Sequence, residues 1–205
     1  MLTLSLLLPK GKIIVIEGMD KAGKRTQSRL LMDALKVSGK ICGIIDLPDY
    51  NTPIGAEIKA FLDGKRDYSN EVKHMILAAN RWEKKMEIES MVDNGTIIIL
   101  NRYYQSNLVY GASNGININW LLNLDRGLPK EDVVIVIEIT PKVSQQRSPV
   151  EYRDKFEMDH NLLLEVHNNY RKLGRKFKWN LVNGEKRREE VHQDIMKIIK
   201  RLLKL

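Results

Sequence analysis

Five short apolar runs recur along the chain, and longer segments with helical periodicity separate them. Two of the runs, 13–16 and 97–100, show no alternation of polar residues, as expected of strands buried on both faces. Strands that alternate with helices form a parallel sheet covered by helices on both sides. We therefore predict an α/β fold with strands at 12–17, 41–47, 96–101, 133–139 and 178–182.

Three longer segments have the period of amphipathic helices: 27–37, 72–92 and 189–203, of which the second is the longest. The last carries Val191, Ile195 and other aliphatic residues on one face and lysines on the other, which predicts a helix covering the sheet. No linker or internal repeat interrupts the 205 residues. We expect one domain over residues 1–205.

The formal net charge is +8, but its distribution argues against a nucleic-acid groove. Basic residues spread over the predicted helices and gather at 186–188 and 197–204, with no aromatic residue between them. Nucleic-acid surfaces usually combine clustered cations with groups that stack on bases. The charge is therefore interpreted as a solvated helix face, and no nucleic-acid partner is expected.

Cysteine content and hydropathy indicate the cellular compartment in which the protein is expected. Cys42 is the single cysteine and lies in an apolar run, so it is interpreted as a buried, unreactive thiol. Residues 1–8 are apolar but too short to span a bilayer, and they lack the features of a secretory signal. We expect a cytoplasmic protein without a membrane partner.

The segment from Gly18 to Thr26 matches the phosphate-binding pattern Gly-x4-Gly-Lys between a predicted strand and a predicted helix. Gly18 and Gly23 let the backbone N–H groups converge on phosphate oxygens, while Lys24 reaches the β- and γ-phosphates. The next position, whose hydroxyl usually ligates Mg²⁺, is Arg25, a cation that cannot ligate a metal. The pattern still predicts nucleotide binding.

A phosphate loop alone is compatible with motor, GTPase and kinase chemistry. The chain lacks a Thr-Lys-x-Asp guanine-binding motif and is short for a motor. Four segments favour kinase chemistry, because together they resemble the thymidylate kinase family from residue 13 to about 195. They read Glu-Gly-Met-Asp-Lys-Ala-Gly-Lys at 17–24, Ala-Asn-Arg-Trp-Glu at 79–83, Asn-Arg-Tyr at 101–103 and Gly-Leu-Pro at 127–129.

The resemblance implies transfer of the γ-phosphoryl group of ATP to dTMP, giving dTDP and ADP, with Mg²⁺. It also implies a three-layer P-loop fold, with a five-stranded parallel sheet flanked by helices, and usually a homodimer. The charged segment 141–157 resembles the family's lid, which closes over ATP and excludes water.

Transfer between two polyanions depends mainly on cationic clamping and positioning, so lysines and arginines are the expected catalytic groups. The candidates are Lys21, Lys24, Arg25, Arg102, Arg147 and Arg153. Arg102 matches the arginine that contacts the acceptor phosphate, and Arg147 and Arg153 come from the lid. The residues expected to bind ATP are Gly18, Met19, Asp20, Lys21, Ala22, Gly23, Lys24, Arg25, Thr26, Asn183 and Gly184, with the last two bordering adenine.

On the acceptor side, Asp20 resembles the carboxylate that accepts a hydrogen bond from the deoxyribose 3′-hydroxyl. Arg81 matches the arginine that binds the thymine edge, and Tyr110 fills the space of a ribose 2′-hydroxyl. Trp82 is interpreted as a core residue. The residues expected to bind the acceptor are Asp20, Pro48, Tyr50, Leu77, Arg81, Arg102, Ser106 and Tyr110.

Several positions depart from the family pattern. The usual Asp-Arg-Tyr begins with Asn101, so a carboxylate near the metal's water shell is an amide, and no direct metal ligand is assigned. Asn101 could act only through water, and we hypothesise that Arg25 fills part of the metal's role. Tyr50 stands where a phosphate-binding arginine is common, and Leu77 where a phenylalanine stacks on thymine. Mg²⁺ dependence and base preference therefore stay open.

Three functions follow from this pattern. The leading one is a thymidylate kinase that acts on free ATP and dTMP. The second is a nucleoside monophosphate kinase of broader specificity on the same scaffold. The third is a weakly active nucleotide-binding or nucleic-acid-binding relative, motivated by Arg25, Asn101 and the net charge.

Overall fold

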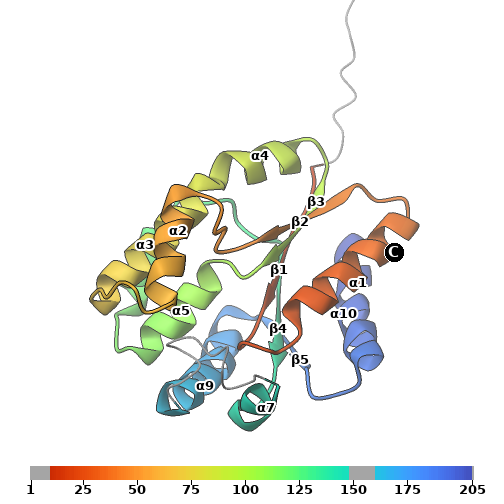
Figure 1. The fold of residues 1–205 in the computed structure, drawn as a ribbon. Coiled ribbons are helices and arrows are strands. Elements are labelled where there is room, and N and C mark those ends of the chain that lie inside the picture. Colours follow the sequence, from red (N-terminus) through yellow and green to blue (C-terminus); the bar gives the residue numbers. More distant parts are fainter. Residues whose placement is uncertain (1–9, 148–159, 205) are drawn as a thin grey trace, which may run out of the picture.

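The computed structural model describes residues 10–147 and 160–204. At its centre, Figure 1 shows a five-stranded parallel sheet with the strand order β2-β3-β1-β4-β5. The strands are β1 (Ile13–Glu17), β2 (Cys42–Asp46), β3 (Ile97–Asn101), β4 (Val133–Glu138) and β5 (Asn180–Asn183). Each overlaps one of the predicted apolar runs, so the expected α/β fold is confirmed.

Strand β1 lies in the middle of the sheet because its residues 13–16 are apolar on both faces. Val15 pairs with Leu100 of β3 on one side and with Val134 of β4 on the other, and all residues of β1 and β3 are buried. Strand β2 is at an edge, and there Cys42 is only half-buried. The prediction of a buried thiol is therefore wrong, although partial burial does raise the pKa of Cys42 and disfavours the reactive thiolate.

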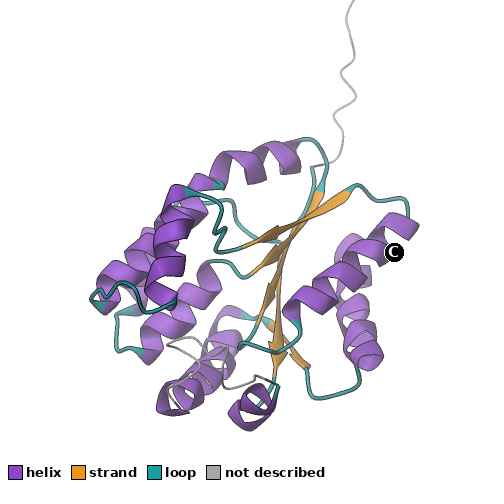
Figure 2. Cartoon of the chain, in the orientation of Figure 1, coloured by secondary structure: helices purple, strands orange, loops and turns teal. Residues whose placement is uncertain are grey.

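Nine helices are found in the described ranges. They are α1 (Lys24–Val37), α2 (Pro53–Leu62), α3 (Asn70–Glu83), α4 (Lys85–Asp93), α5 (Tyr104–Ser113), α6 (Ile118–Leu124), α7 (Pro141–Gln146), α9 (His160–Phe177) and α10 (Arg188–Leu203). Figure 2 shows α1 and α10 on one face of the sheet and α3, α5 and α9 on the other. Val191, Ile195 and Ile199 of α10 are buried, as the amphipathic pattern predicts. None of these helices is both long and apolar enough to cross a membrane.

The helix predicted over 72–92 is instead two helices, α3 and α4, which meet at Lys84. The N–H of Lys84 donates to the carbonyl of Arg81, three residues back, at 3.1 Å, and this bond tightens the last turn of α3. The ammonium of Lys84 binds the Asp49 carboxylate at 2.6 Å. The break between α3 and α4 is therefore accompanied by a contact with a distant segment. No proline or glycine marks the break in the sequence. With 18 residues, α9 is longer than either helix.

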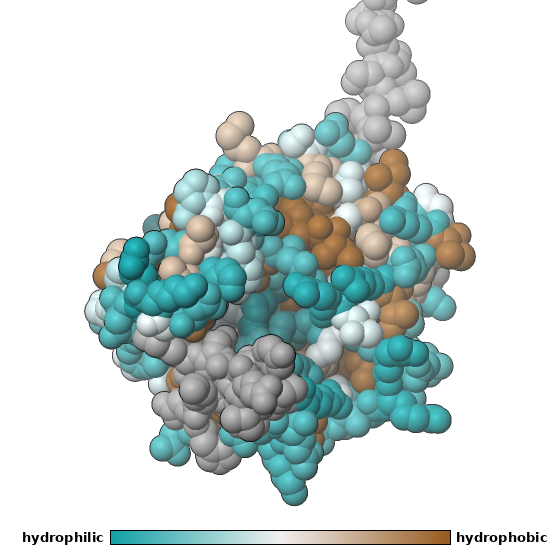
Figure 3. Space-filling view, in the orientation of Figure 1, coloured by the Kyte–Doolittle hydropathy of each residue, from teal (hydrophilic) through white to brown (hydrophobic). Residues whose placement is uncertain are grey.

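The carboxyl ends of all five parallel strands lie at one edge of the sheet, where ligands of parallel sheets bind. The final residues of β1 to β5 are, in order, Glu17, Asp46, Asn101, Glu138 and Asn183. The phosphate loop follows β1 at this edge. Figure 3 shows hydrophilic residues lining a recess between the helical layers.

Candidate active site

The phosphate loop joins β1 to α1 in a conformation that its glycines make possible. Gly18 and Gly23 have φ angles of 139° and 95°, which residues with a Cβ rarely adopt. A Cβ on Gly18 would lie 2.4 Å from the carbonyl oxygen of Ile137, so close packing against β4 also requires glycine here. The loop thus has the predicted position, and α1 begins at Lys24, earlier than predicted.

Lys24 folds back over this loop. Its Nζ donates to the carbonyl oxygens of Gly18 at 3.0 Å and Met19 at 2.8 Å, and lies 3.8 Å from Asp20. Only 11% of its side chain is exposed. An ammonium group held within the curve of the loop faces the place where the loop's N–H groups would bind phosphate.

Arg102 connects the phosphate loop to α5. It follows β3 with a φ of 66°, forms an ion pair with Asp20, and donates to the Ser106 hydroxyl at 3.1 Å. The Tyr110 hydroxyl donates to the other oxygen of Asp20 at 3.3 Å. Burial alone would raise the pKa of Asp20, but the charges of Arg102 and Lys24 outweigh burial and lower the pKa to about 2. Asp20 is therefore ionised at neutral pH.

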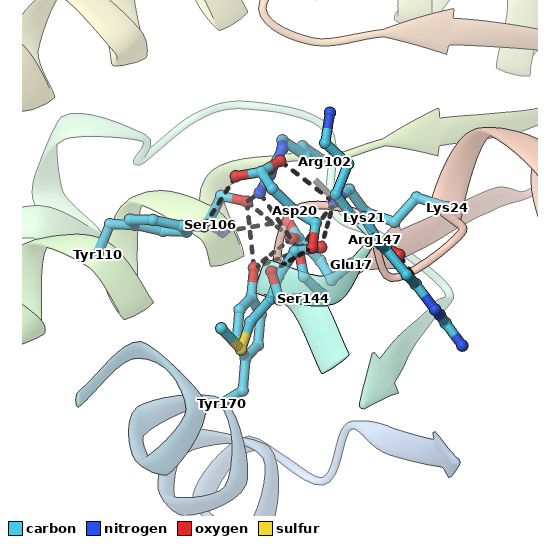
Figure 4. A network of polar contacts seen from close by, with 12 residues as sticks. Glu17, Asp20, Lys21, Lys24, Arg102, Ser106, Tyr110, Ser144, Arg147 and Tyr170 are labelled. Carbon is cyan, nitrogen blue, oxygen red and sulfur yellow. Dashed lines mark hydrogen bonds and ion pairs between the residues drawn. The ribbon is translucent and has the colours of Figure 1, made fainter. Parts of the chain in front are cut away.

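Glu17 lies beneath this network and is fully buried (Figure 4). One carboxylate oxygen accepts from the N–H groups of Tyr103 at 2.8 Å and Ser106 at 3.1 Å. The other accepts from the hydroxyls of Ser106 at 2.7 Å and Tyr170 at 2.9 Å. These donors compensate the desolvation of the carboxylate. Glu17 therefore ties α5 and α9 to the phosphate loop, a role that sequence reasoning missed although a charged residue ending an apolar strand was a usable signal.

A cavity adjoins the phosphate loop between α3, α5 and the loop after β2, and we call it the acceptor cavity after the residues expected to bind there. All eight residues expected to bind the acceptor line this cavity: Asp20, Pro48, Tyr50, Leu77, Arg81, Arg102, Ser106 and Tyr110. Leu47, Leu62, Asn80, Tyr103 and Asn107 complete the lining. Apolar and aromatic walls with a few charged groups are typical of small-molecule sites.

Arg81 reaches this cavity from α3, but its planar fork is already engaged. Nε and Nη2 donate to the two carboxylate oxygens of Asp125 at 2.8 and 2.9 Å, and both side chains are buried. Bidentate pairing fixes the plane of the guanidinium group. The pair uses the N–H of Nε and one N–H of Nη2, so the expected contact with a base is narrowed to the two N–H groups of Nη1 and the second N–H of Nη2. Sequence reasoning did not find Asp125, which follows α6 and carries no motif.

Asn80 holds the loop that carries Pro48 and Tyr50. Its side-chain oxygen accepts from the N–H of Asp49 at 2.8 Å, and its amide nitrogen donates to the Thr52 hydroxyl at 2.9 Å. Because Asn80 is fully buried, these bonds fix the loop against α3. Tyr50 itself is 44% exposed and lines both the acceptor cavity and the cleft next to it.

That second cleft runs along the phosphate loop toward the edge of the sheet, and we call it the loop cleft. Its lining includes Lys21, Gly23, Lys24, Arg25, Thr26, Asp46 and Asn101, together with Asp20, Leu47, Pro48, Tyr50 and Arg102, which it shares with the acceptor cavity. Arg25 is exposed, and its Nη2 lies 3.8 Å from the Asp46 carboxylate. Asn101 is buried, donates to Asp46 and accepts from the Ser28 hydroxyl. Sequence reasoning did not consider Asp46.

The chemistry of these side chains limits how a metal could bind. In the ranges that the structure describes, no group of three or more His, Cys, Asp or Glu side chains could hold a metal ion. The oxygen donors along the loop cleft include the Asp46 carboxylate and the Thr26 hydroxyl. Mg²⁺ commonly binds through nucleotide phosphates, waters and one or two carboxylates. The residues present therefore fit Mg²⁺ that arrives with the nucleotide and keeps most of its water.

Arg147, at the end of α7, brings two parts of the expected ATP site together. Its guanidinium donates to the carbonyl oxygens of Lys21 at 3.4 Å and Gly184 at 3.2 Å, and Asn183 ends β5 directly before Gly184. Ser144 of α7 donates to the carbonyl of Asp20 at 2.9 Å. The first part of the expected lid thus contacts the phosphate loop, whereas Arg153 lies outside the described residues.

The interpretation of Trp82 as a core residue is wrong. Its side chain is 39% exposed, and the indole N–H donates to the carbonyl of Leu124 at 2.8 Å. Gly127 has a φ of 103° and packs so closely that a Cβ there would lie 3.1 Å from the Trp82 ring. Trp82 therefore joins two of the family segments, 79–83 and 127–129, at the surface.

Several known proteins are similar to this chain in sequence and fold. A sequence model described as thymidylate kinase matches residues 16–195. The thymidylate kinase of Plasmodium falciparum is 33% identical over 195 residues, covering 94% of this chain and 91% of that protein. The human thymidylate kinase is 30% identical over 197 residues, covering 91% and 88%. A solved structure of thymidylate kinase from Candida albicans matches with a TM-score of 0.83 and 27% identity, covering 94% of this chain and 92% of that one. This chain therefore belongs to the thymidylate kinase family.

Proposed function

We propose that the protein transfers the γ-phosphoryl group of ATP to the 5′-phosphate of dTMP, producing dTDP and ADP. The position of Arg102 supports this most strongly. Its guanidinium contacts Gly18 and Asp20 of the phosphate loop and, on the acceptor side, Ser106. Transfer between two phosphates requires a cation at the boundary of two anion-accepting compartments, because charge repulsion opposes their approach.

On the donor side, the loop N–H groups and Lys24 would hold the β- and γ-phosphates. Lys21 of the same loop and Arg147, which contacts this loop, would add positive charge around the transferring group. Mg²⁺ bound with the nucleotide would neutralise further charge on the phosphate oxygens. These groups align and neutralise the reactants, and no covalent protein intermediate is needed.

On the acceptor side, Arg102 would neutralise the 5′-phosphate of dTMP as it approaches the γ-phosphoryl group. Asp20, which is ionised at neutral pH, would accept a hydrogen bond from the 3′-hydroxyl. Tyr110 donates to Asp20 and lines the same cavity, so its ring would crowd a ribose 2′-hydroxyl. The site would thus select a deoxynucleoside monophosphate.

The test is a panel of acceptors with ATP, with and without Mg²⁺. Initial rates are measured for dTMP, dUMP, dGMP, UMP and thymidine. We expect dTMP to have the highest kcat/KM and thymidine to be inactive, because only a monophosphate supplies the anion for Arg102. A preference for thymidine over dTMP would overturn the proposal. Calorimetric binding of both nucleotides without turnover would favour a sensor instead.

A kinase of broader specificity is the second candidate, and two cavity residues favour it. Leu77 and Tyr50 line the acceptor cavity where the family commonly has a stacking phenylalanine and an arginine. The solved relative from Candida albicans is itself described as having broad substrate specificity. Turnover of dGMP or UMP within about tenfold of dTMP, about 1.4 kcal/mol in transition-state stabilisation, would select this candidate.

We also propose a homodimer, which is usual in the family. Met75 and Trp82 of α3 are 43% and 39% exposed, and apolar side chains on an exposed helix face are available for a partner. Light scattering after size-exclusion chromatography would report the mass. A monomer across micromolar concentrations would overturn this proposal without affecting the proposed reaction.

A further inference from the structure

Two strand ends in the loop cleft carry side chains that are chemically matched. Asp46 ends β2 and Asn101 ends β3, and the two are register partners in the sheet. The Asn101 amide nitrogen donates to an Asp46 carboxylate oxygen. The two residues are 55 positions apart in the sequence, so only the pairing of β2 with β3 brings them together.

A third residue fixes the direction of this hydrogen bond. The Ser28 hydroxyl of α1 donates to the Asn101 side-chain oxygen, and both residues are buried. With its oxygen bound there, the amide presents its N–H₂ group to Asp46. An aspartate at 101 would instead place two carboxylates in contact, which is unfavourable unless one binds a proton. A carboxylate at 46 and an amide at 101 are therefore complementary, because the amide donates a hydrogen bond that the carboxylate accepts.

The carboxylate of this pair faces the phosphate loop. Asp46 lines the loop cleft together with Lys24 and Thr26, and half of its side chain is exposed. Its Oδ1 accepts from Asn101, while its Oδ2 lies 3.8 Å from Nη2 of Arg25. At this distance the Arg25 contact is an exposed ion pair rather than a hydrogen bond, so water or a hydrated cation can compete for this oxygen.

We propose that Asp46 is the carboxylate of the metal's water shell in this protein, and that Asn101 is the residue that positions it. Asp46 would accept hydrogen bonds from waters on a divalent cation carried by the nucleotide phosphates. Arg25 would neutralise Asp46 when no cation is present. This inference rests on the proposed function only in that both require a nucleotide at the phosphate loop.

Binding of Mn²⁺ to the full-length protein with saturating ADP tests the proposal without turnover. Free Mn²⁺ is measured by electron paramagnetic resonance, and affinity for metal-free ADP is measured by calorimetry. We expect Asp46→Asn to weaken Mn²⁺ binding about tenfold, as the loss of outer-shell partners commonly does. Metal-free ADP affinity should stay within about threefold of wild type, because Asp46 lies beside the loop and outside it. Asp33→Asn, which removes an exposed carboxylate of α1, is the control for net charge.

A reciprocal exchange tests whether Mn²⁺ binding needs one carboxylate in the pair, whichever of the two positions carries it. Asn101→Asp combined with Asp46→Asn keeps one carboxylate and one amide across the same strand pair, and it should restore Mn²⁺ affinity to within about threefold of wild type. Unchanged Mn²⁺ affinity in Asp46→Asn would overturn the proposal, even if dTMP is phosphorylated normally. If Asp46→Asn unfolds, failure of the folded exchange variant to bind Mn²⁺ as wild type does would overturn it. Absence of dTMP turnover with an intact Mn²⁺ result would instead contradict the proposed reaction alone.

Discussion

The acceptor cavity and the loop cleft share a wall but are built differently. In the cavity, functional side chains bind one another: Arg81 pairs with Asp125, and its side chain is 6% exposed. In the cleft, the Arg25 side chain is 71% exposed and approaches Asp46 only to 3.8 Å. A site whose groups are held before the ligand arrives loses little entropy on binding. We therefore expect the acceptor cavity to be preorganised, and the outer edge of the loop cleft to take its final charge balance from a bound nucleotide.

The largest expected difference between the halves comes from two arginines. Arg102→Met removes the cation between the phosphate loop and the acceptor cavity and leaves Asp20 without its main partner. The value of kcat/KM for dTMP should therefore fall about 10³- to 10⁴-fold. Arg25→Met should cost less than about tenfold, because this exposed group is not held in place. Steady-state kinetics on both variants check this contrast. Equal losses would show that the donor edge is as preorganised as the cavity.

The Arg81–Asp125 pair should dominate stability on the acceptor side. Asp125→Leu leaves a buried guanidinium unpaired and should lower the free energy of unfolding by about 3–5 kcal/mol, measured by urea denaturation. The double variant Asp125→Leu with Arg81→Met should recover most of this loss, because neither charge then remains. It should still have a raised KM for dTMP. Full recovery of both properties would argue that Arg81 is structural only.

Acid should weaken the contact of Asp20 with Arg102. Because the pKa of Asp20 falls from 3.8 to about 2 on folding, its ionised form stabilises the protein above about pH 4, and this stabilisation is lost as the pH falls through about 2. Asp20→Asn lacks this contribution, so its difference in unfolding free energy from wild type should shrink between pH 5 and about 2.5. Urea denaturation over this range measures the difference, which would stay constant over the whole range if folding left the pKa of Asp20 unchanged.

The smallest expected effect concerns base recognition. Leu77→Phe should lower the KM for dTMP by about fivefold, because an aromatic pair contributes roughly 1 kcal/mol beyond its buried area. Tyr50→Phe, which keeps the ring at the shared wall, is a matched variant and should change KM by less than about twofold. No improvement with Leu77→Phe would mean that the base does not stack at this position.

Patterns confined to contiguous residues could be predicted well. The apolar strands and the loop from Gly18 to Lys24 depend on neighbours in the sequence, so their residue types suffice. The resemblance placed the acceptor residues on the same cavity, and the structure brings all of them together. The roles of Trp82 and Cys42 were wrong because helix and strand patterns do not say which element lies at an edge of the fold.

Residue types therefore decided the kind of chemistry: glycines and a lysine for phosphate, arginines for two anions, and apolar runs for a buried parallel sheet. The tertiary structure decided which charged and polar side chains act in pairs. Arg81 with Asp125 and Asn101 with Asp46 lie 44 and 55 residues apart, and they meet only after distant elements have packed. The physical reason is that a buried charge or amide requires a partner, while nothing in its local sequence specifies where that partner lies.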